Sequence, residues 1–189
     1  MEAPIIYKPD FMGREFASLN FELLWNHLDW VRVGATPRRE YYVNRLPNPQ
    51  PYSYGAAEFA RTYQPQPSNP TIDMIWELAE LYAGYEFDVC FLNGYENGRD
   101  HLGWHADDSP EMDDARPIAI VSLGAEREIW FRDIRSYETG INPEKLLLGN
   151  GSLCLMQPGM QDTHQHRIPK SPRHDCGPRI SFTFRGYKA

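Results

Sequence analysis

The second half of the chain alternates between short apolar runs and turn signals. Six such runs follow Gly84, at residues 87–92, 118–123, 128–131, 145–148, 152–156 and 180–184. Turn-forming sequences such as Gly149-Asn150-Gly151 and Gln157-Pro158-Gly159 separate them. Runs of this length and spacing are typical of the strands of an all-β sandwich or barrel. We therefore expect this half of the chain to form a core of the jelly-roll kind.

The first half contains two amphipathic stretches with the period of a helix. The first follows Ser18, a residue type favoured at helix N-caps. The second begins at the capping residue Asn69 and the first-turn residue Pro70, runs to about Tyr82 and ends at Gly84. The apolar positions at helical spacing are Phe21, Leu24, Trp25 and Leu28 in the first stretch and Ile72, Ile75, Trp76 and Ala79 in the second.

Together these patterns predict a mostly β protein with flanking helices, in the α+β class. The core is expected to be a double-stranded β-helix, or jelly roll, with the two N-terminal helices packed outside it. Residues 36–70 are rich in proline, tyrosine and arginine and have no sustained period, which indicates extended segments and turns. The chain contains no repeat and no linker, so a single domain over residues 1–189 is predicted.

The amino-acid composition indicates a globular protein that does not span a membrane. The 41% hydrophobic and 13% aromatic content is typical of a globular chain. No apolar run approaches the roughly 18 residues of a membrane span, and the N-terminus lacks the features of a signal peptide. We expect a monomer without membrane association, located in the cytoplasm, or in the nucleus if the source is eukaryotic. Three cysteines without a CxxC pair predict reduced thiols.

The charge of the chain is unevenly distributed. A formal net charge of −7 argues against indiscriminate binding to nucleic acid, because phosphate contacts require lysine and arginine. Residues 164–188 nevertheless carry six basic residues and one acidic residue, and residues 32–61 carry five arginines and two glutamates. Such segments can hold a phosphate backbone locally, although solvated surface charge explains them equally well.

A candidate metal site begins with His105 and Asp107. In an extended segment, residues two apart point to the same face, so both side chains can reach one ion. The similar pair His27 and Asp29 lies in the first predicted helix, where residues two apart point roughly 200° apart. Two imidazoles and one carboxylate can hold one face of Fe(II) and leave other positions open. The third ligand is left open among His166, His164 and His174, and a three-histidine site with both His164 and His166 is an alternative.

Two arginines occupy one alternating run near the C-terminus. Arg179 and Arg185 lie six residues apart and therefore face the same side as Ser181 and Thr183. Their Cα atoms would be about 20 Å apart in a strand. Rigid guanidinium forks bind carboxylates in pairs of hydrogen bonds, so the two side chains suit a five-carbon diacid between them. The alternative is that they are arginines at a strand edge, paired with surface acids.

In this order, the motifs of the C-terminal half resemble the AlkB family, Fe(II)/2-oxoglutarate dioxygenases that remove alkyl groups from nucleic-acid bases. The resemblance implies Fe(II), 2-oxoglutarate and O₂ as metal and co-substrates. It selects His166 over His164, and so implies that His105, Asp107 and His166 form the catalytic metal site. The motifs that carry the resemblance are Asn93-Gly94-Tyr95, Trp104-His105-Ala106-Asp107-Asp108, Gln165-His166-Arg167-Ile168-Pro169-Lys170, Pro178-Arg179 and Phe182-Thr183-Phe184-Arg185.

The resemblance also implies which residues bind 2-oxoglutarate: Asn93, Tyr95, Arg179, Ser181 and Arg185. Ser181 departs from the family pattern, in which the closing signature reads Arg-x-Asn. Because serine is shorter than asparagine, we expect one contact to 2-oxoglutarate to be lost or made through water.

For the substrate, the resemblance implies N-alkylated bases of DNA or RNA, such as 1-methyladenine and 3-methylcytosine, with release of succinate, CO₂ and formaldehyde. Tyr52 and Tyr54 resemble the tyrosine-x-tyrosine of the family's nucleotide lid, which places a lid within residues 36–70. Asp108 and Lys145 are the other implied substrate contacts. Ser109 follows Asp108 at a position where many relatives have a further acidic residue. The sequence therefore does not determine which base is preferred.

Two other functions fit the sequence. The same chemistry on a protein side chain or small metabolite is favoured somewhat by the acidic net charge. A jelly-roll binding module without turnover is the second, and the complete ligand set together with both arginines argues against it.

Overall fold

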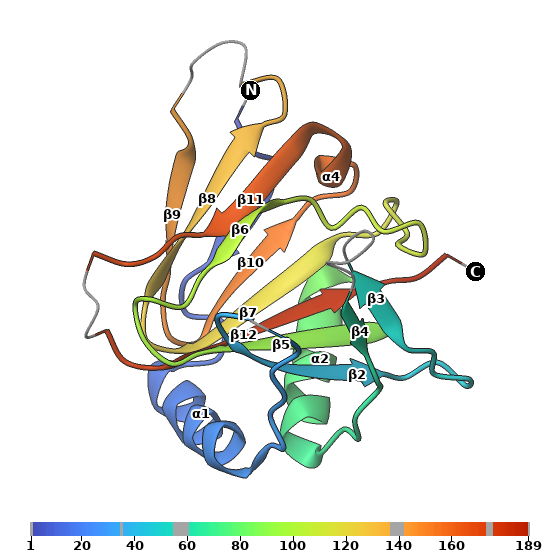
Figure 1. The fold of residues 1–189 in the computed structure, drawn as a ribbon, viewed down its shortest axis with the longest axis vertical. Helices are drawn as coiled ribbons and strands as arrows, with labels where there is room; N and C mark the ends of the chain where they lie inside the picture. The colour runs from blue at the N-terminus through green and yellow to red at the C-terminus, as the bar shows by residue number, and fades with distance from the viewer. Residues whose placement is uncertain (1, 35, 55–60, 137–141, 173–175, 189) are drawn as a thin grey trace.

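The structure is a computed structural model that describes residues 2–34, 36–54, 61–136, 142–172 and 176–188 (Figure 1). The strands are β1 (Ile5–Lys8), β2 (Arg39–Asn44), β3 (Tyr52–Tyr54), β4 (Arg61–Tyr63), β5 (Val89–Tyr95), β6 (Leu102–His105), β7 (Ile118–Gly124), β8 (Arg127–Asp133), β9 (Glu144–Leu148), β10 (Ser152–Met156), β11 (His164–Ile168) and β12 (Arg179–Arg185). The helices are α1 (Arg14–His27), α2 (Pro70–Ala83) and α4 (Met160–Thr163).

Two antiparallel sheets form the core. The larger has the order β1-β10-β7-β12-β5-β2 and the smaller the order β6-β11-β8-β9, while β3 and β4 pair separately. The inner faces of the two sheets share one buried cluster, in which Ile120 and Met156 of the larger sheet pack with Ile129 and Phe131 of the smaller. This arrangement confirms the predicted jelly-roll core.

Helices α1 and α2 cover the outer face of the larger sheet (Figure 1). Trp76 of α2 is completely buried, and its ring lies 5.3 Å from the ring of Phe184 of β12 in an edge-on contact. Leu24 of α1 belongs to the same apolar cluster, together with Val121 and Phe182 of the sheet. The prediction of two N-terminal helices outside the core is therefore confirmed.

The helix boundaries test the capping signals in the sequence. The prediction for α2 is confirmed, because Asn69 Oδ1 accepts a hydrogen bond of 2.9 Å from the Ile72 amide and Gly84 ends the helix at φ 71°. The prediction that Ser18 caps α1 is wrong, since that helix begins at Arg14. Ser18 lies inside it and donates its hydroxyl to the Arg14 carbonyl four residues earlier, a bond that satisfies serine within a helix.

All six apolar runs form strands, with shifted ends such as Val89–Tyr95 for residues 87–92. Residues 36–70 contain β2, β3 and β4, so the prediction of extended structure is correct as far as that segment is described. β6 and β11 contain no continuous apolar run, and β1, although it includes Ile5, Ile6 and Tyr7, lies outside the predicted runs. The strands that the apolar pattern missed include the two that carry the candidate metal ligands.

The predictions from cysteine content and hydropathy can also be compared with the structure. All three cysteines are free, and Cys90 and Cys154 are buried in the core. Burial raises the pKa of Cys154 to about 12, so its thiol stays protonated. Among the described helices, none combines the length and the apolar character that a membrane crossing requires.

Candidate metal centre and active-site pocket

The three predicted metal ligands come together between the two sheets. His105 ends β6 and is paired directly with His166 of β11, and Asp107 follows β6 by two residues. The carboxylate of Asp107 lies 3.7 Å from His105 Nε2 and 3.8 Å from His166 Nε2. One ligand atom from each residue lies within 4.8 Å of the other two. The pairing of β6 with β11 therefore brings the three side chains together in a His-Asp-His cluster.

The other candidate ligands lie elsewhere. His164 is buried two residues before His166, but its Nδ1 contacts the Thr163 hydroxyl at 2.8 Å and its side chain lines a separate depression with Phe131 and Glu144. His174 lies outside the described residues. His27 is at the end of α1, away from the cluster. The geometry therefore favours the His105-Asp107-His166 set over a site with His164.

The protonation states of the cluster suit a divalent cation. Burial lowers the pKa of His105, and burial together with the neighbouring His105 lowers the pKa of His166 to about 3. Burial acts to raise the pKa of Asp107, but the charge of Arg185 and the two imidazoles outweigh it, so that pKa lies below its ordinary value. Neutral imidazoles and an ionised carboxylate are the forms that bind metal. Asp107 Oδ2 is buried without a hydrogen-bond partner among the described residues, so the donor set fits an iron ion.

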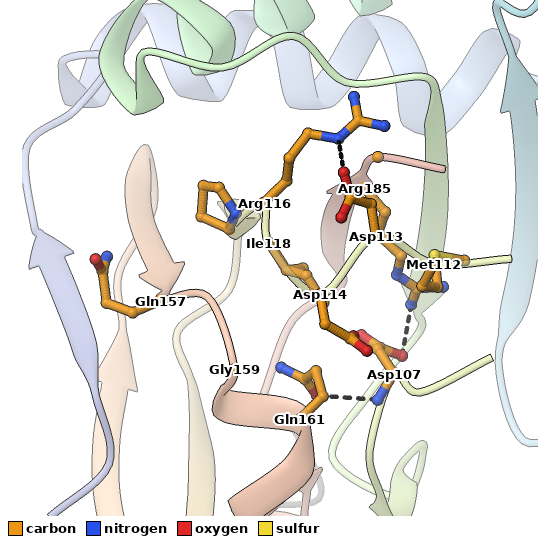
Figure 2. Close-up of a pocket in the computed structure, with 12 residues that line it drawn as sticks. Asp107, Met112, Asp113, Asp114, Arg116, Ile118, Gln157, Gly159, Gln161 and Arg185 are labelled. Carbon is orange, nitrogen blue, oxygen red and sulfur yellow. Dashed lines mark hydrogen bonds and ion pairs between the residues drawn. The ribbon is translucent and has the colours of Figure 1, made fainter. Parts of the chain in front are cut away.

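Two contacts hold Asp107 in place (Figure 2). Arg185 Nη2 donates to Asp107 Oδ1 at 2.8 Å, and the Asp107 amide donates to Gln161 Oε1 at 2.9 Å. Gln161 belongs to α4, which leads into the strand of His166, so it links the segments of two ligands. It borders a cavity of about 10 Å³, room for about one water molecule. Sequence reasoning missed Gln161, because no motif distinguishes it from other glutamines.

A pair of buried arginines flanks the cluster on β12. Alternation places Arg179, Ser181, Thr183 and Arg185 on the inner face, while Ile180, Phe182 and Phe184 pack under the helices. β12 lies between β5 and β7, so neither arginine is at a sheet edge. The alternative of edge arginines paired with surface acids is thereby excluded.

Arg179 has the environment of an anion-binding residue. It is fully buried, and its Nη2 donates to the hydroxyls of Ser122 at 2.8 Å and Ser181 at 3.2 Å. Its Nε and Nη1 have no hydrogen-bond partner among the described residues, and burial lowers its pKa to about 10. A buried cation with two unsatisfied donors is costly unless a carboxylate pairs with it. The site therefore fits one end of a dicarboxylate.

Asn93 and Tyr95 join this group from β5. Asn93 is paired with Ser181 and Tyr95 with Arg179 across the sheet. The Tyr95 ring lies 5.3 Å from the Arg179 guanidinium, and Asn93 Oδ1 accepts a 2.6 Å hydrogen bond from Arg38 Nε. The structure thus gathers all five residues predicted for 2-oxoglutarate on one inner face.

Comparisons with known proteins identify the family. The model of the 2OG-Fe(II) oxygenase superfamily matches residues 9–185. The human DNA oxidative demethylase ALKBH2 is 32% identical over 186 residues, covering 92% of this chain and 69% of that protein. The chain belongs to the AlkB family. The His105-Asp107-His166 cluster accordingly lies in a domain of the 2OG-Fe(II) oxygenase superfamily, for which the metal is Fe(II) and the co-substrates are 2-oxoglutarate and O₂.

One further relative and one solved structure extend these comparisons. The bovine alpha-ketoglutarate-dependent dioxygenase alkB homolog 3 is 32% identical over 188 residues, which cover 94% of this chain and 64% of that protein. The chain therefore spans slightly under two thirds of the length of such relatives. The solved structure of OsALKBH1 has a TM-score of 0.66 with 14% sequence identity, and the match covers 98% of this chain and 99% of that one. This last likeness supports the jelly-roll fold alone.

An open pocket of about 40 Å³ lies beside the metal cluster of this AlkB-family domain. Except for Leu102, its lining residues are aromatic or polar, and the full set comprises Arg38, Tyr52, Tyr54, Tyr63, Phe91, Asn93, Leu102, His105, Asp107 and Arg185. Tyr52 is buried and contacts the Ser109 hydroxyl at 3.2 Å, whereas Tyr54 is 39% exposed. Asp108 is exposed and lies close enough to Tyr54 to act on its charge. Tyr52 and Tyr54 therefore line the pocket, whereas Asp108 is not among its lining residues.

Lys145 is the predicted site residue that lies apart from the others. It is paired with Trp130 of β8, and alternation along β8 and β9 turns both side chains to the outer face of the smaller sheet. His166 is paired with Phe131 and therefore points inward. Lys145 is thus separated from the pocket by the sheet itself, and a contact between it and a base inside the pocket does not fit this geometry.

Proposed function

We propose that this chain catalyses the oxidative dealkylation of N-alkylated bases in DNA or RNA, such as 1-methyladenine and 3-methylcytosine. The observation that carries the proposal is the aromatic pocket that opens directly at the His105-Asp107-His166 cluster. The name of one relative, a DNA oxidative demethylase, supports it. The co-products would be succinate, CO₂ and formaldehyde.

In this proposal, His105, Asp107 and His166 hold Fe(II), which together with 2-oxoglutarate and O₂ supplies the oxidising chemistry for a C–H bond. His105 Nδ1 lies 3.0 Å from the Gly103 carbonyl, so that hydrogen bond leaves Nε2 as the ligand atom. The positive charge of Arg185 compensates the negative charge of Asp107 and so favours the ionised carboxylate. These contacts orient the ligands before a metal ion binds.

Arg179 would receive the distal carboxylate of 2-oxoglutarate through its two unpartnered donors. Ser181 accepts a hydrogen bond from Arg179, so we assign it to the orientation of that guanidinium. Asn93 and Tyr95 would line the same site from β5. Where the family's asparagine would contact 2-oxoglutarate, Ser181 would instead contact Arg179.

The flipped base would enter through the mouth that Tyr54 borders. An aromatic ring gains about 1–3 kcal/mol for each stacked base, and an enzyme that acts on a base must hold it outside its stack. We assign stacking to Tyr54 and wall contacts to Tyr52, with Asp108 at the rim. Residues 36–70 would act as the lid, and the chain is expected to work as a monomer.

The test is mass spectrometry of oligonucleotides that carry 1-methyladenine or 3-methylcytosine, incubated with Fe(II), 2-oxoglutarate and ascorbate. We expect loss of a methyl mass that His166→Ala abolishes. His164→Ala is the matched control, because it removes a buried histidine of the same strand outside the cluster. Formation of succinate without a change in oligonucleotide mass would instead favour a protein or small-molecule substrate, the reading that the net charge of −7 supports.

A further inference from the structure

The outer face of the smaller sheet carries side chains that the proposed reaction does not use. Strand β11 alternates, so His166 points to the metal cluster and Arg167 points outward. Arg167 is paired with Trp130, and Trp130 with Lys145. Helices α1 and α2 pack on the other sheet (Figure 1). Among the described elements, no helix packs over this face.

Indole rings and cations alternate across this face. The Arg167 guanidinium lies 4.7 Å from the Trp104 ring and 4.2 Å from the Trp130 ring. Arg132 lies 4.3 Å from the Trp104 ring, and the Lys145 ammonium lies 4.3 Å from the Trp130 ring. We call these five residues, Trp104, Arg132, Arg167, Trp130 and Lys145, the indole–cation ladder.

The indole–cation ladder is at least partly exposed to solvent and is positively charged. Lys145 is exposed, and the two indoles and two arginines are partly exposed. Arg167 Nε is buried without a hydrogen-bond partner among the described residues. Trp130 Nε1 donates to Glu128 Oε2 at 2.8 Å, so among the described residues one carboxylate lies beside Arg167 and Lys145. A cluster with excess positive charge on a chain of net charge −7 is complementary to a polyanion.

The ladder also lies next to the mouth of the pocket. Trp104 directly precedes the ligand His105 on β6, which is an edge strand of its sheet. Leu102 and His105 of the same strand line the pocket. A strand of nucleic acid that leaves the pocket over this edge meets Trp104 first. Crossing from β6 to β9 takes three interstrand spacings, or about 14 Å.

We propose that the indole–cation ladder binds the nucleotides that flank the target base in single-stranded nucleic acid, with phosphates at Arg167 and Lys145 and a base stacked on Trp130. The proposal rests on the proposed function and specifies the path of its substrate. Aromatic rings that alternate with cations are how proteins hold single strands without reading their sequence. Lys145 is exposed, so its stem can leave the Trp130 ring to a base while its ammonium contacts the phosphate.

The test measures binding of a fluorescent, unmodified single-stranded oligonucleotide of about 15 nucleotides, a length within the range of such platforms. We expect Trp130→Ala to weaken binding about 5- to 150-fold, as loss of one base stack does. Trp130→Phe keeps a ring and should restore most of the affinity. Lys145→Ala should reduce the slope of log K against log salt by about 0.7, the effect of one phosphate contact on a single strand.

Lys8→Glu is the control, because Lys8 is an exposed lysine on β1, an edge strand of the other sheet. Wild-type affinity in both Trp130→Ala and Lys145→Ala, with melting temperatures retained, would overturn the proposal, as would equal weakening by Lys8→Glu. The same variants should raise KM for a methylated oligonucleotide of this length far more than for a methylated trinucleotide. Because the binding assay needs no turnover, absence of demethylation would refute the proposed function and leave the ladder to be judged by binding alone.

Discussion

Replacement of Arg179 by methionine should stabilise the ligand-free protein while it destroys the binding of 2-oxoglutarate. The guanidinium is fully buried, and its hydrogen-bond partners are two neutral serine hydroxyls. Burial lowers its pKa from 12.5 to about 10, so the unfolded chain holds the proton more tightly than the folded chain. The charged side chain therefore destabilises the folded state at every pH below about 10, by about 3 kcal/mol. An apolar residue of similar volume should recover about 1–4 kcal/mol.

The effect on co-substrate binding has the opposite sign. A hydrogen bond to a charged group contributes about 1.5–3 kcal/mol, and Arg179 offers two unpartnered donors to a carboxylate. Their loss should raise the Kd for 2-oxoglutarate by about 10²- to 10⁴-fold. In wild type, 2-oxoglutarate at 100 times its Kd should add about 2.7 kcal/mol to the free energy of unfolding, and in Arg179→Met it should add almost nothing at that concentration.

Urea unfolding with and without 2-oxoglutarate, with Mn(II) present throughout, measures both quantities. Arg127→Met is the matched control, since Arg127 is also buried and its guanidinium lies 5.4 Å from the Tyr95 ring. Arg127 donates to the carbonyls of Asn97, Asp100 and Pro169, so its removal leaves these partly buried acceptors unpaired and should destabilise the protein. If Arg179→Met unfolds more easily than wild type and still responds fully to 2-oxoglutarate, the assignment of Arg179 is wrong.

Four further outcomes are expected. Gln161→Leu removes the acceptor of the Asp107 amide and should weaken Co(II) binding, followed by absorption spectroscopy, about 10- to 100-fold. Asn69→Ala should lower the free energy of unfolding by about 1 kcal/mol, whereas Ser18→Ala, inside its helix, should change it by less than about 0.5 kcal/mol. Chelation of the metal should lower the Tm of wild type and leave that of His166→Ala unchanged. Tyr54→Ala should raise KM for a methylated oligonucleotide with little change in the Kd of 2-oxoglutarate, and an unchanged KM would remove Tyr54 from the substrate site.

The elements that sequence predicted well are those in which one local signal is enough. The second helix combines a capping asparagine, a first-turn proline and a terminal glycine, and its bounds follow. The first helix begins at Arg14, before Ser18, which is its best capping residue by type. The packing of Ala17 and Phe21 against the sheet stabilises the helix on both sides of Ser18, so the helix does not need to begin there. The strict alternation of β12 likewise predicted the face of both arginines.

The parts that sequence left open depend on strand register. Alternation places His164 and His166 on one side of β11, and only pairing with β6 brings His166 opposite His105. Lys145 illustrates the same point, because period-2 spacing cannot say which face of a sheet is the inner one. Gln161 reaches Asp107 across 54 positions of sequence through one side chain, a contact that no local pattern encodes.

The strands that the apolar pattern missed explain how the site is built into the fold. β6 and β11 place His105 and His166 at inward positions that Ile129 and Phe131 fill on the neighbouring strand. The core of the smaller sheet is therefore interrupted where the ligands converge, and the larger sheet presents Arg179 and Arg185 from the opposite side. Buried polar groups at these positions cost stability until a metal ion and an anion pair with them. A bound metal ion and anion would therefore complete the interior of this jelly roll. The polar residues that form the site stand where apolar residues would otherwise be, and this is why the apolar pattern of the sequence did not reveal β6 and β11.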